Sequence, residues 1–171
     1  MDRASEAYRQ AKQQAYRYLS ARGRTKRELR ERLLQRGHQA DVIELVLREL
    51  EAEGYLDDRT FAHDWARYRL QTHPCGPRRL AWELQARGVE RELLAEVLRS
   101  VYAEFDEATL AERALSKRVR AAAPGLSSRE RGPLARYLMR LGFDPNIITA
   151  ILAARFPSQA PLDIVDSDPA C

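Results

Sequence analysis

The chain of 171 residues is long enough to bury a hydrophobic core, and its 44% hydrophobic and 32% charged residues are typical of a globular protein. No apolar run exceeds five residues, whereas about 20 are needed to cross a bilayer, so a membrane-spanning segment is excluded. The net charge of +4 suits an anionic partner, either nucleic acid or an acidic protein surface, although it is also compatible with solubility alone.

The ends of the chain and its cysteines indicate the compartment. The first 15 residues carry alternating charges and lack the apolar core of a secretory signal, so we expect no export. Only two cysteines occur, Cys75 in an expected turn and Cys171 at the end, which is too few for a disulfide framework. These features predict a cytoplasmic protein that does not associate with a membrane.

The first predicted repeat, residues 4–54, consists of three amphipathic helices. Thr25 and Glu28 have the spacing of a capping box, which places the start of the second helix directly after Thr25. Gly37 is expected to end that helix as its C′ residue, where a left-handed backbone conformation favours glycine. The apolar positions are Ala11, Ala15, Tyr16 and Leu19, then Leu29 and Leu33, and finally Val42, Ile43, Val46 and Leu47.

The second predicted repeat, residues 57–103, has the same spacing around Gly88. Its middle helix is expected to begin at Gly76-Pro77, because proline favours the first position of a helix, and Val89 should pack back onto the helix that Gly88 ends. Asp57 and Asp58 precede a helical segment, where N-capping is a better explanation than a metal site or a general base. The apolar positions are Phe61, Ala62, Trp65 and Tyr68, then Leu80 and Leu84, and finally Leu93, Leu94, Val97 and Leu98.

The third predicted repeat, residues 107–156, is anchored by Gly142 but departs from the pattern. An insertion at residues 121–132 and the position of Pro133, nine residues before the glycine, predict that the middle helix starts later or is kinked. Asp144-Pro145 marks the start of the last helix, and Phe143 should pack back onto the helix before it. The apolar positions are Leu110, Ala114 and Leu115, then Leu134 and Leu138, and finally Ile147, Ile148, Ile151 and Leu152.

The three copies agree position by position. Leucines stand eight and four residues before each glycine, and apolar residues stand five, six, nine and ten residues after it. Because each repeat is too small to bury a core alone, repeats of this kind stack side by side. We therefore predict an all-α protein, an elongated tandem array of three three-helix repeats, followed by a disordered acidic tail at residues 157–171.

Basic residues, nearly all of them arginine, recur at equivalent positions of the first two repeats. If the middle helices of successive repeats face the same way, these residues form a basic strip along one side of the stack. Arginine suits such a strip because its guanidinium group makes bidentate contacts with carboxylate or phosphate. The alternative is that each arginine is an ordinary solvated residue, partly neutralised by acids on its own helix. The candidate partner-binding or DNA-binding residues are Arg22, Arg24, Lys26, Arg27, Arg30, Arg67, Arg69, Arg78, Arg79, Trp82 and Arg87.

Three aromatic residues of the second repeat have different expected environments. Trp65 and Tyr68 are expected to pack on the first helix of that repeat, as ordinary core-facing residues. Trp82 lies on the face opposite Leu80 and Leu84, so we expect it to be exposed, and it is included with the binding candidates for that reason.

The sequence contains no constellation of catalytic or metal-ligating residues. His38, His63 and His73 share no metal-ligand spacing with one another or with a cysteine pair. Phosphate-binding loops and nucleophile elbows are also absent. We therefore expect a protein that is not an enzyme and that binds no metal or cofactor.

Three blocks of residues have a sequence pattern that the helical periodicity of apolar positions alone does not explain. They are Gly54 to Ala62 with Trp65 and Arg69 behind them; Gly76-Pro77-Arg78-Arg79-Leu80 with Glu83-Leu84 and Gly88-Val89; and Leu19 to Arg22 with Glu28-Leu29-Arg30 and Leu33. In these blocks the chain resembles the RecX family. The resemblance extends over about residues 4–156 but is weaker in the third repeat, so no role is carried over to Arg136 or Arg140.

The resemblance implies a regulator of the bacterial recombinase RecA. RecX proteins are elongated stacks of three-helix repeats that lodge in the groove of the RecA–DNA filament and alter its assembly, ATPase, strand exchange and coprotease activities. The implied role lies in DNA repair, homologous recombination and the SOS response, with inhibition of RecA as the expected effect.

Two other functions are compatible with the helices and their charge. A helix-turn-helix DNA-binding protein would share the short helix pairs, but the helix after the glycine is acidic in the first two copies, which disfavours sequence-specific DNA reading. A helical scaffold unrelated to recombination would explain the repeats but not the family motif. We expect a monomer that binds the RecA filament and, weakly and without sequence preference, single- or double-stranded DNA.

Overall fold

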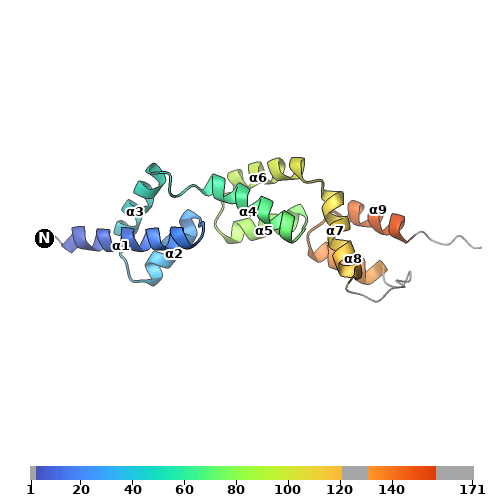
Figure 1. Cartoon of the computed structure of the whole chain (residues 1–171), viewed down its shortest axis with the longest axis horizontal. Helices are drawn as coiled ribbons and strands as arrows, with labels where there is room; N and C mark the ends of the chain where they lie inside the picture. Colours follow the sequence, from blue (N-terminus) through green and yellow to red (C-terminus); the bar gives the residue numbers. More distant parts are fainter. Residues whose placement is uncertain (1–2, 121–130, 157–171) are drawn as a thin grey trace, which may run out of the picture.

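The computed structural model describes residues 3–120 and 131–156, and within these ranges the chain forms nine helices and no strands. Figure 1 shows the helices in three successive groups along one long axis, with the N-terminus at one end. The predicted all-α, elongated array is confirmed. Repeat 1 consists of α1 (Arg3–Ala21), α2 (Lys26–Gln35) and α3 (Ala40–Ala52); repeat 2 of α4 (Asp58–Thr72), α5 (Pro77–Ala86) and α6 (Arg91–Glu104); repeat 3 of α7 (Glu107–Arg120), α8 (Arg131–Arg140) and α9 (Pro145–Arg155).

The middle helix of each repeat ends at the predicted glycine. Gly37, Gly88 and Gly142 have φ of 84°, 91° and 81°, which is the left-handed region that a side chain would strain. After each glycine, the next N–H donates to the carbonyl five residues earlier, as in His38 to Leu33 at 3.3 Å, which is the Schellman arrangement. Gly54 ends α3 in the same way with φ of 76°, although it lies outside the repeat pattern from which the other caps were predicted.

The predicted helix starts are also observed. The Thr25 hydroxyl accepts from the N–H of Glu28 at 3.1 Å, and the Asp57 carboxylate accepts from the N–H groups of Arg59 and Thr60 at 2.9 and 3.2 Å. Asp144 caps α9 by accepting from the N–H of Asn146 at 2.8 Å. N-capping, rather than a metal or a base, is therefore the observed role of Asp57.

One expectation about repeat 3 is wrong, because its middle helix does not start late. Helix α8 is present from Arg131, eleven residues before Gly142, which is the same offset as Lys26 before Gly37 and Pro77 before Gly88. Pro133 falls in the first turn of α8. Backbone N–H groups there have no acceptor within the helix, so the N–H that proline lacks costs no helical hydrogen bond. The inserted residues 121–130 and the expected tail at residues 157–171 lie outside the described part of the chain.

The apolar positions predicted from the repeat form two separate cores. All six leucines before the glycines are buried, and of the twelve apolar positions after them nine are buried and three partly buried. One core lies within repeat 1 and includes Ala11, Leu33, Leu47 and Leu56, whereas the other is continuous through repeats 2 and 3. Repeat 1 thus has its own core, and repeats 2 and 3 share one.

Successive repeats are joined by the same pair of positions. At the junction of repeats 1 and 2, the hydroxyl of Thr25, twelve residues before Gly37, donates to the carbonyl of Arg87, the residue before Gly88, at 2.5 Å. At the junction of repeats 2 and 3, the N–H of Gly76, twelve residues before Gly88, donates to the carbonyl of Leu141, the residue before Gly142, at 2.9 Å. The start of one middle helix therefore binds a carbonyl left free at the end of the next.

Candidate partner-binding surface

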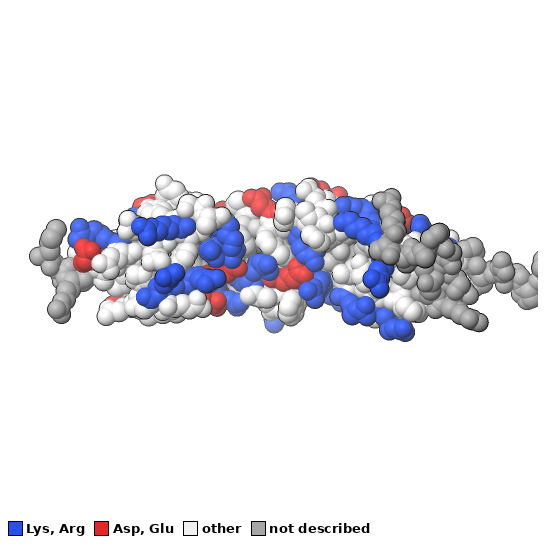
Figure 2. All heavy atoms as spheres, turned by 60° about the horizontal axis from the view of Figure 1, so that its bottom comes forward, with Lys and Arg blue, Asp and Glu red and all other residues white. Residues whose placement is uncertain are grey.

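The basic residues predicted to form a strip belong mainly to the middle helices and the turns next to them. Figure 2 shows Lys and Arg side chains along the length of one face, with acidic side chains between some of them. Because the three middle helices occupy equivalent places in successive repeats, bases on them follow the long axis. The arrangement therefore favours a long, basic contact surface rather than an enclosed site.

Most of the candidates in repeat 1 are paired with acids. Arg22 lies 3.1 Å from Glu28, Lys26 lies 2.7 Å from Glu51, Arg27 lies 3.5 Å from Glu31, and Arg30 lies 2.7 Å from Glu44. Arg27 also donates to the carbonyl of Ala86 in repeat 2. Part of the charge on this surface is thus neutralised within the molecule, by partners that are close in space but often distant in sequence.

Arg24 differs from its neighbours because it contacts no carboxylate among the described residues. Its guanidinium group donates to the carbonyl of Tyr18 at 3.2 Å and lies over the Tyr18 ring at 5.4 Å from the centroid. Burial, followed by repulsion from Arg22, lowers the pKa of Arg24. The positive charge here exceeds what nearby acids balance.

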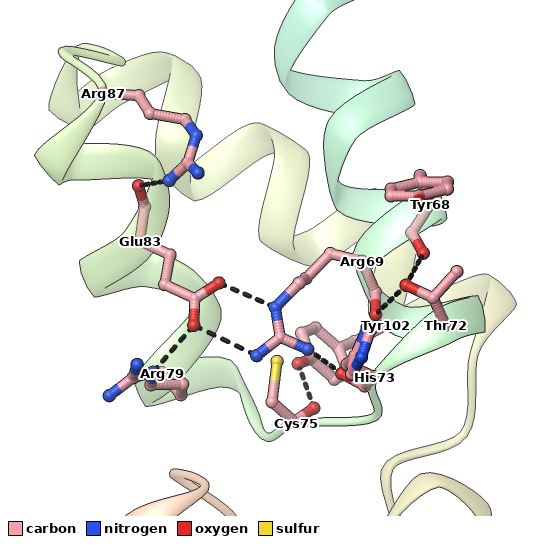
Figure 3. A network of polar contacts seen from close by, with 9 residues as sticks. All are labelled: Tyr68, Arg69, Thr72, His73, Cys75, Arg79, Glu83, Arg87 and Tyr102. Carbon is pink, nitrogen blue, oxygen red and sulfur yellow. Dashed lines mark hydrogen bonds and ion pairs between the residues drawn. The ribbon is translucent and has the colours of Figure 1, made fainter.

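In repeat 2, Arg69 and Arg79 belong to an ion-pair network around the buried Glu83, shown in Figure 3. Both guanidinium groups donate to the carboxylate of Glu83, with Arg69 at 2.8 and 3.1 Å and Arg79 at 2.7 Å. Burial opposes the charged form of Glu83, but the two arginines outweigh it and lower its pKa. The pair of Arg69 and Glu83 connects α4 to α5, and Arg79 supports Glu83 from the same helix, so both arginines have a structural role whether or not they meet a partner.

Cys75 and Tyr102 line the same network. The Tyr102 hydroxyl donates to the Cys75 carbonyl at 2.8 Å, and burial raises the pKa of the Cys75 thiol to about 11. A thiol with this pKa stays protonated and unreactive at neutral pH. Cys75 is thus a core residue.

The remaining candidates of repeat 2 are more available. Arg67 pairs with Glu104 at 2.9 Å on the surface, whereas Arg78 is exposed and Arg87 contacts no carboxylate in the described ranges. Trp82 is 61% exposed, as predicted, and the Arg79 guanidinium lies over its ring at 5.0 Å. Among the predicted residues, Arg24, Arg78 and Arg87 therefore offer the least neutralised charge, and Trp82 offers an aromatic contact.

The expectation for Tyr68 is wrong, because its side chain is 65% exposed. Helix α4 has two stripes: Ala62, Ala66 and Leu70 face the core, whereas Phe61, Trp65 and Tyr68 face another element. Trp65 is partly buried against the core, as expected, and also lies under the Arg87 guanidinium at 4.1 Å. The predicted set of Phe61, Ala62, Trp65 and Tyr68 was right for Ala62, but the buried stripe continues through Ala66 and Leu70 rather than through Tyr68.

The second stripe of α4 lines a cleft between repeats 1 and 2, which we call the junction cleft. Its volume is about 730 Å³, and its walls carry the aromatic residues Tyr55, Phe61, Trp65 and Tyr68. Arg22, Arg24 and Arg87 also line it, together with Asp57 and Asp64. The cleft was not predicted, although the spacing of Phe61, Trp65 and Tyr68 as a stripe distinct from Ala62 and Ala66 was a visible signal.

No group of three or more His, Cys, Asp or Glu side chains in residues 3–120 and 131–156 is placed to hold a metal ion. Among the helices described, none combines the length and the hydropathy that crossing a membrane requires.

Comparison with known proteins identifies relatives over most of the chain. Residues 11–50 match the sequence profile of the first three-helix domain of RecX, and residues 57–98 match that of the second. A regulatory protein RecX from Halorhodospira halophila is 38% identical over 88% of this chain and 89% of its own length. One from Geobacillus thermodenitrificans is 35% identical over 87% of this chain, which spans only 55% of that longer protein.

Solved structures agree with the fold. The crystal structure of RecX from Lactobacillus salivarius superposes with a TM-score of 0.71 over 88% of this chain and 97% of its own, at 21% identity. A second crystal structure, of a regulatory protein RecX, gives a TM-score of 0.75 over 86% of this chain and 72% of its own, also at 21% identity.

Proposed function

Because this chain belongs to the RecX family, we propose that it regulates RecA by binding the RecA–DNA filament, and that binding inhibits the recombinase, ATPase and coprotease activities. The observation that carries the proposal is the match to the RecX profiles and relatives, which covers both repeats that hold the predicted binding residues. In this proposal the protein acts in the cytoplasm and is not an enzyme, so any ATP hydrolysis belongs to RecA.

The shape and charge of the molecule support this role physically. An elongated stack can contact several subunits of a filament at once, so modest contacts in each repeat add to a high overall affinity. The least neutralised bases, Arg24, Arg78 and Arg87, are suited to an acidic protein surface or to phosphate. The paired residues are weaker candidates, because a partner must first displace their internal acids.

Binding to free DNA, in this proposal, is weak and independent of sequence. Arginines without a base-reading helix contact the phosphate backbone, so the affinity should fall steeply as salt is added. A strong preference for one duplex sequence at physiological salt would instead favour a DNA-binding regulator that acts without RecA. Co-purification with RecA filaments, with a duplex or with an unrelated protein would separate RecA regulation from DNA binding and from a scaffold role.

The direct test is charge reversal at the bases that no acid among the described residues neutralises. Arg78 is exposed and forms no ion pair in the described structure, so Arg78→Glu should leave the helical content intact. Combined with Arg24→Glu, it should raise the protein concentration needed for half-maximal inhibition of the DNA-dependent RecA ATPase by about tenfold or more. Arg99→Glu on α6, outside the strip, makes the same charge change as Arg78→Glu alone and is the matched control for that single reversal.

The proposal fails if the double reversal keeps full inhibition while circular dichroism shows an intact fold. Arg79 is a poor choice for this test, because reversing it places a second carboxylate beside Glu83 and disturbs the fold as well as the surface.

A further inference from the structure

The junction cleft holds aromatic surface that the fold does not bury. Tyr55 is 60% exposed and Tyr68 is 65% exposed, although both belong to helices or turns with well-packed neighbours. Exposed rings gathered around a hollow, rather than scattered singly, are characteristic of a binding site. A volume of about 730 Å³ is that of a site for one or two small ring-bearing groups.

Two of the four aromatic side chains in the cleft, Tyr55 and Trp65, are held in place before any ligand arrives. Tyr16 packs edge-on against Tyr55, with ring centroids 5.3 Å apart and planes at 85°, and the Tyr16 hydroxyl is fixed by Glu53 at 2.7 Å. Trp65 is fixed on one side by Arg87. A ligand that stacks on these rings therefore orders few side chains on binding, which favours affinity.

Charge in the cleft favours an anion. Arg24 and Arg87 contact no carboxylate in the described structure, whereas Asp57, one of the two acids in the cleft, is already used to cap α4. Asp64 is the remaining acid. A neighbouring cavity shares Arg22 and Arg24 with the cleft and adds Arg32, and its acids Glu28 and Glu31 are paired with Arg22 and Arg27. Cationic groups thus continue from the aromatic walls along α2.

We propose that the junction cleft binds single-stranded nucleic acid, with one or two unpaired bases stacked on Tyr55 and Tyr68 and the flanking phosphates on Arg24 and Arg87. Rigid aromatic rings combined with a cationic path are the features that recognise single strands, since every unpaired base has a flat face and every linkage an anion. A duplex keeps its base faces inside the stack and cannot use the rings. An extended peptide would need free backbone groups to pair with, and the helices that form the walls use theirs internally.

This inference rests on the proposed function, because it assumes that the protein meets DNA in the filament, and it names the form of DNA and the residues. Stacking is tested first with the intrinsic fluorescence of the full chain, which has two tryptophans, Trp65 in the cleft and Trp82 outside it. Oligo(dT) should quench the emission saturably, and the quenching should disappear in Trp65→Phe, where Trp82 still emits. An abasic oligonucleotide of equal length and the matched duplex should cause little quenching at the same phosphate concentration.

Affinity for fluorescein-labelled oligo(dT), measured by anisotropy, tests the rings themselves. Tyr68→Ala should weaken binding about tenfold, which corresponds to about 1.4 kcal/mol, whereas Tyr68→Phe should retain it because the ring face remains. Leu45→Ala removes an exposed apolar side chain of α3 outside the cleft and should have no effect. Equal affinity for the abasic strand, or tighter binding of the duplex, would overturn the inference.

Inhibition of the RecA ATPase, measured on the same variants, separates the two proposals. If the chain binds oligo(dT) in the cleft but has no effect on RecA, the site stands and the proposed function fails. If Tyr68→Ala loses binding to RecA filaments while oligo(dT) never quenches Trp65, the cleft contacts protein and the inference is wrong.

Discussion

The two junctions between repeats use the same backbone positions but differ in what lies behind them. Between repeats 1 and 2, the hydrogen bond from Thr25 to Arg87 is accompanied by polar contacts, such as the Lys26 N–H with the Asp58 carboxylate at 2.8 Å, and by the junction cleft. Between repeats 2 and 3, the hydrogen bond from Gly76 to Leu141 lies beside a continuous apolar core. Equivalent positions therefore join repeats 1 and 2 through polar contacts, whereas they join repeats 2 and 3 beside a shared apolar core.

The difference shows what a repeat needs in order to share a core with its neighbour. Gly76 and Gly142 bring two backbones so close that a Cβ on Gly76 would lie 2.2 Å from the Gly142 carbonyl oxygen, and this approach lets apolar side chains meet across the junction. The equivalent of Gly76 in repeat 1 is Thr25, whose side chain stands between the repeats and forms the hydrogen bond itself. Burial of apolar area is roughly additive, so the shared core couples repeats 2 and 3 in a way that polar contacts do not.

The largest expected effect comes from equivalent leucines in the two cores. Leu33 and Leu138 each lie four residues before a repeat glycine and are fully buried, so either change to Ala should cost about 2–5 kcal/mol. Hydrogen exchange should show that Leu33→Ala lowers protection in α1–α3 alone, whereas Leu138→Ala lowers it throughout α4–α9. Loss of protection in all nine helices from either variant would mean that the junctions do not differ.

Ion pairs within repeats 1 and 2 should differ nearly as much. Glu83→Gln leaves the mostly buried Arg69 with no carboxylate, which should cost about 3–5 kcal/mol in urea unfolding. Glu51→Gln breaks the half-exposed pair with Lys26 and should cost less than about 1 kcal/mol. Similar losses from both variants would show that the Glu83 network adds no more than a surface pair.

The same substitution, glycine to alanine, can be compared at the three repeat glycines. Replacement by Ala imposes left-handed strain of about 1–2 kcal/mol at each. Gly37 has open space around it, Gly88 would meet the Arg27 side chain at 2.6 Å, and Gly142 would meet the backbone nitrogen of Arg79 at 2.4 Å. Thermal unfolding should therefore rank the losses as Gly142→Ala, then Gly88→Ala, then Gly37→Ala, and equal losses would show that strain alone matters.

The smallest effect is expected from acid, which should act in opposite directions on Asp58, at the junction of repeats 1 and 2, and on Glu83, within repeat 2. Burial raises the pKa of Asp58, so its contribution to stability is complete below its unfolded value near 3.8 and is lost as pH rises through the folded pKa. Glu83 has a lowered pKa despite its burial, because of Arg69 and Arg79, so its contribution is complete above 4.5 and is lost as pH falls through the folded pKa.

Unfolding of Asp58→Asn and Glu83→Gln between pH 7 and pH 3.5 checks these signs. Asp58→Asn should gain less than about 1 kcal/mol over the unsubstituted chain at pH 7, because Asp58 is only partly buried, and that gain should shrink in acid. The deficit of Glu83→Gln should also shrink in acid. A deficit of Glu83→Gln that grew as pH fell would contradict the assignment.

The fold and the binding surface were predictable to different degrees. Helix caps at Thr25, Asp57 and Gly142 followed from the sequence, and so did the buried faces of the helices, with α4 as an exception at Tyr68. Capping, left-handed turns and helical periodicity depend on residues within about ten positions of one another. The start of α8 was missed, because Pro133 was weighed as a helix breaker when it occupies the first turn, where proline is tolerated.

Only the tertiary structure decided which bases keep their charge and where a ligand could sit. The repeat pattern identified every candidate arginine, but whether Arg30 is paired depends on Glu44, and the cleft depends on α1, α3, α4 and α5 meeting at one junction. The same local rules place Thr25 and Gly76 at the same point of their repeats, yet only three-dimensional packing reveals that the Thr25 hydroxyl bonds to the next repeat, whereas Gly76 lies too close to Gly142 to carry a side chain. Steric preferences and helical periodicity depend on neighbouring residues. The balance of charge and burial depends instead on residues as far apart as Thr25 and Arg87, which are separated by 62 positions along the chain.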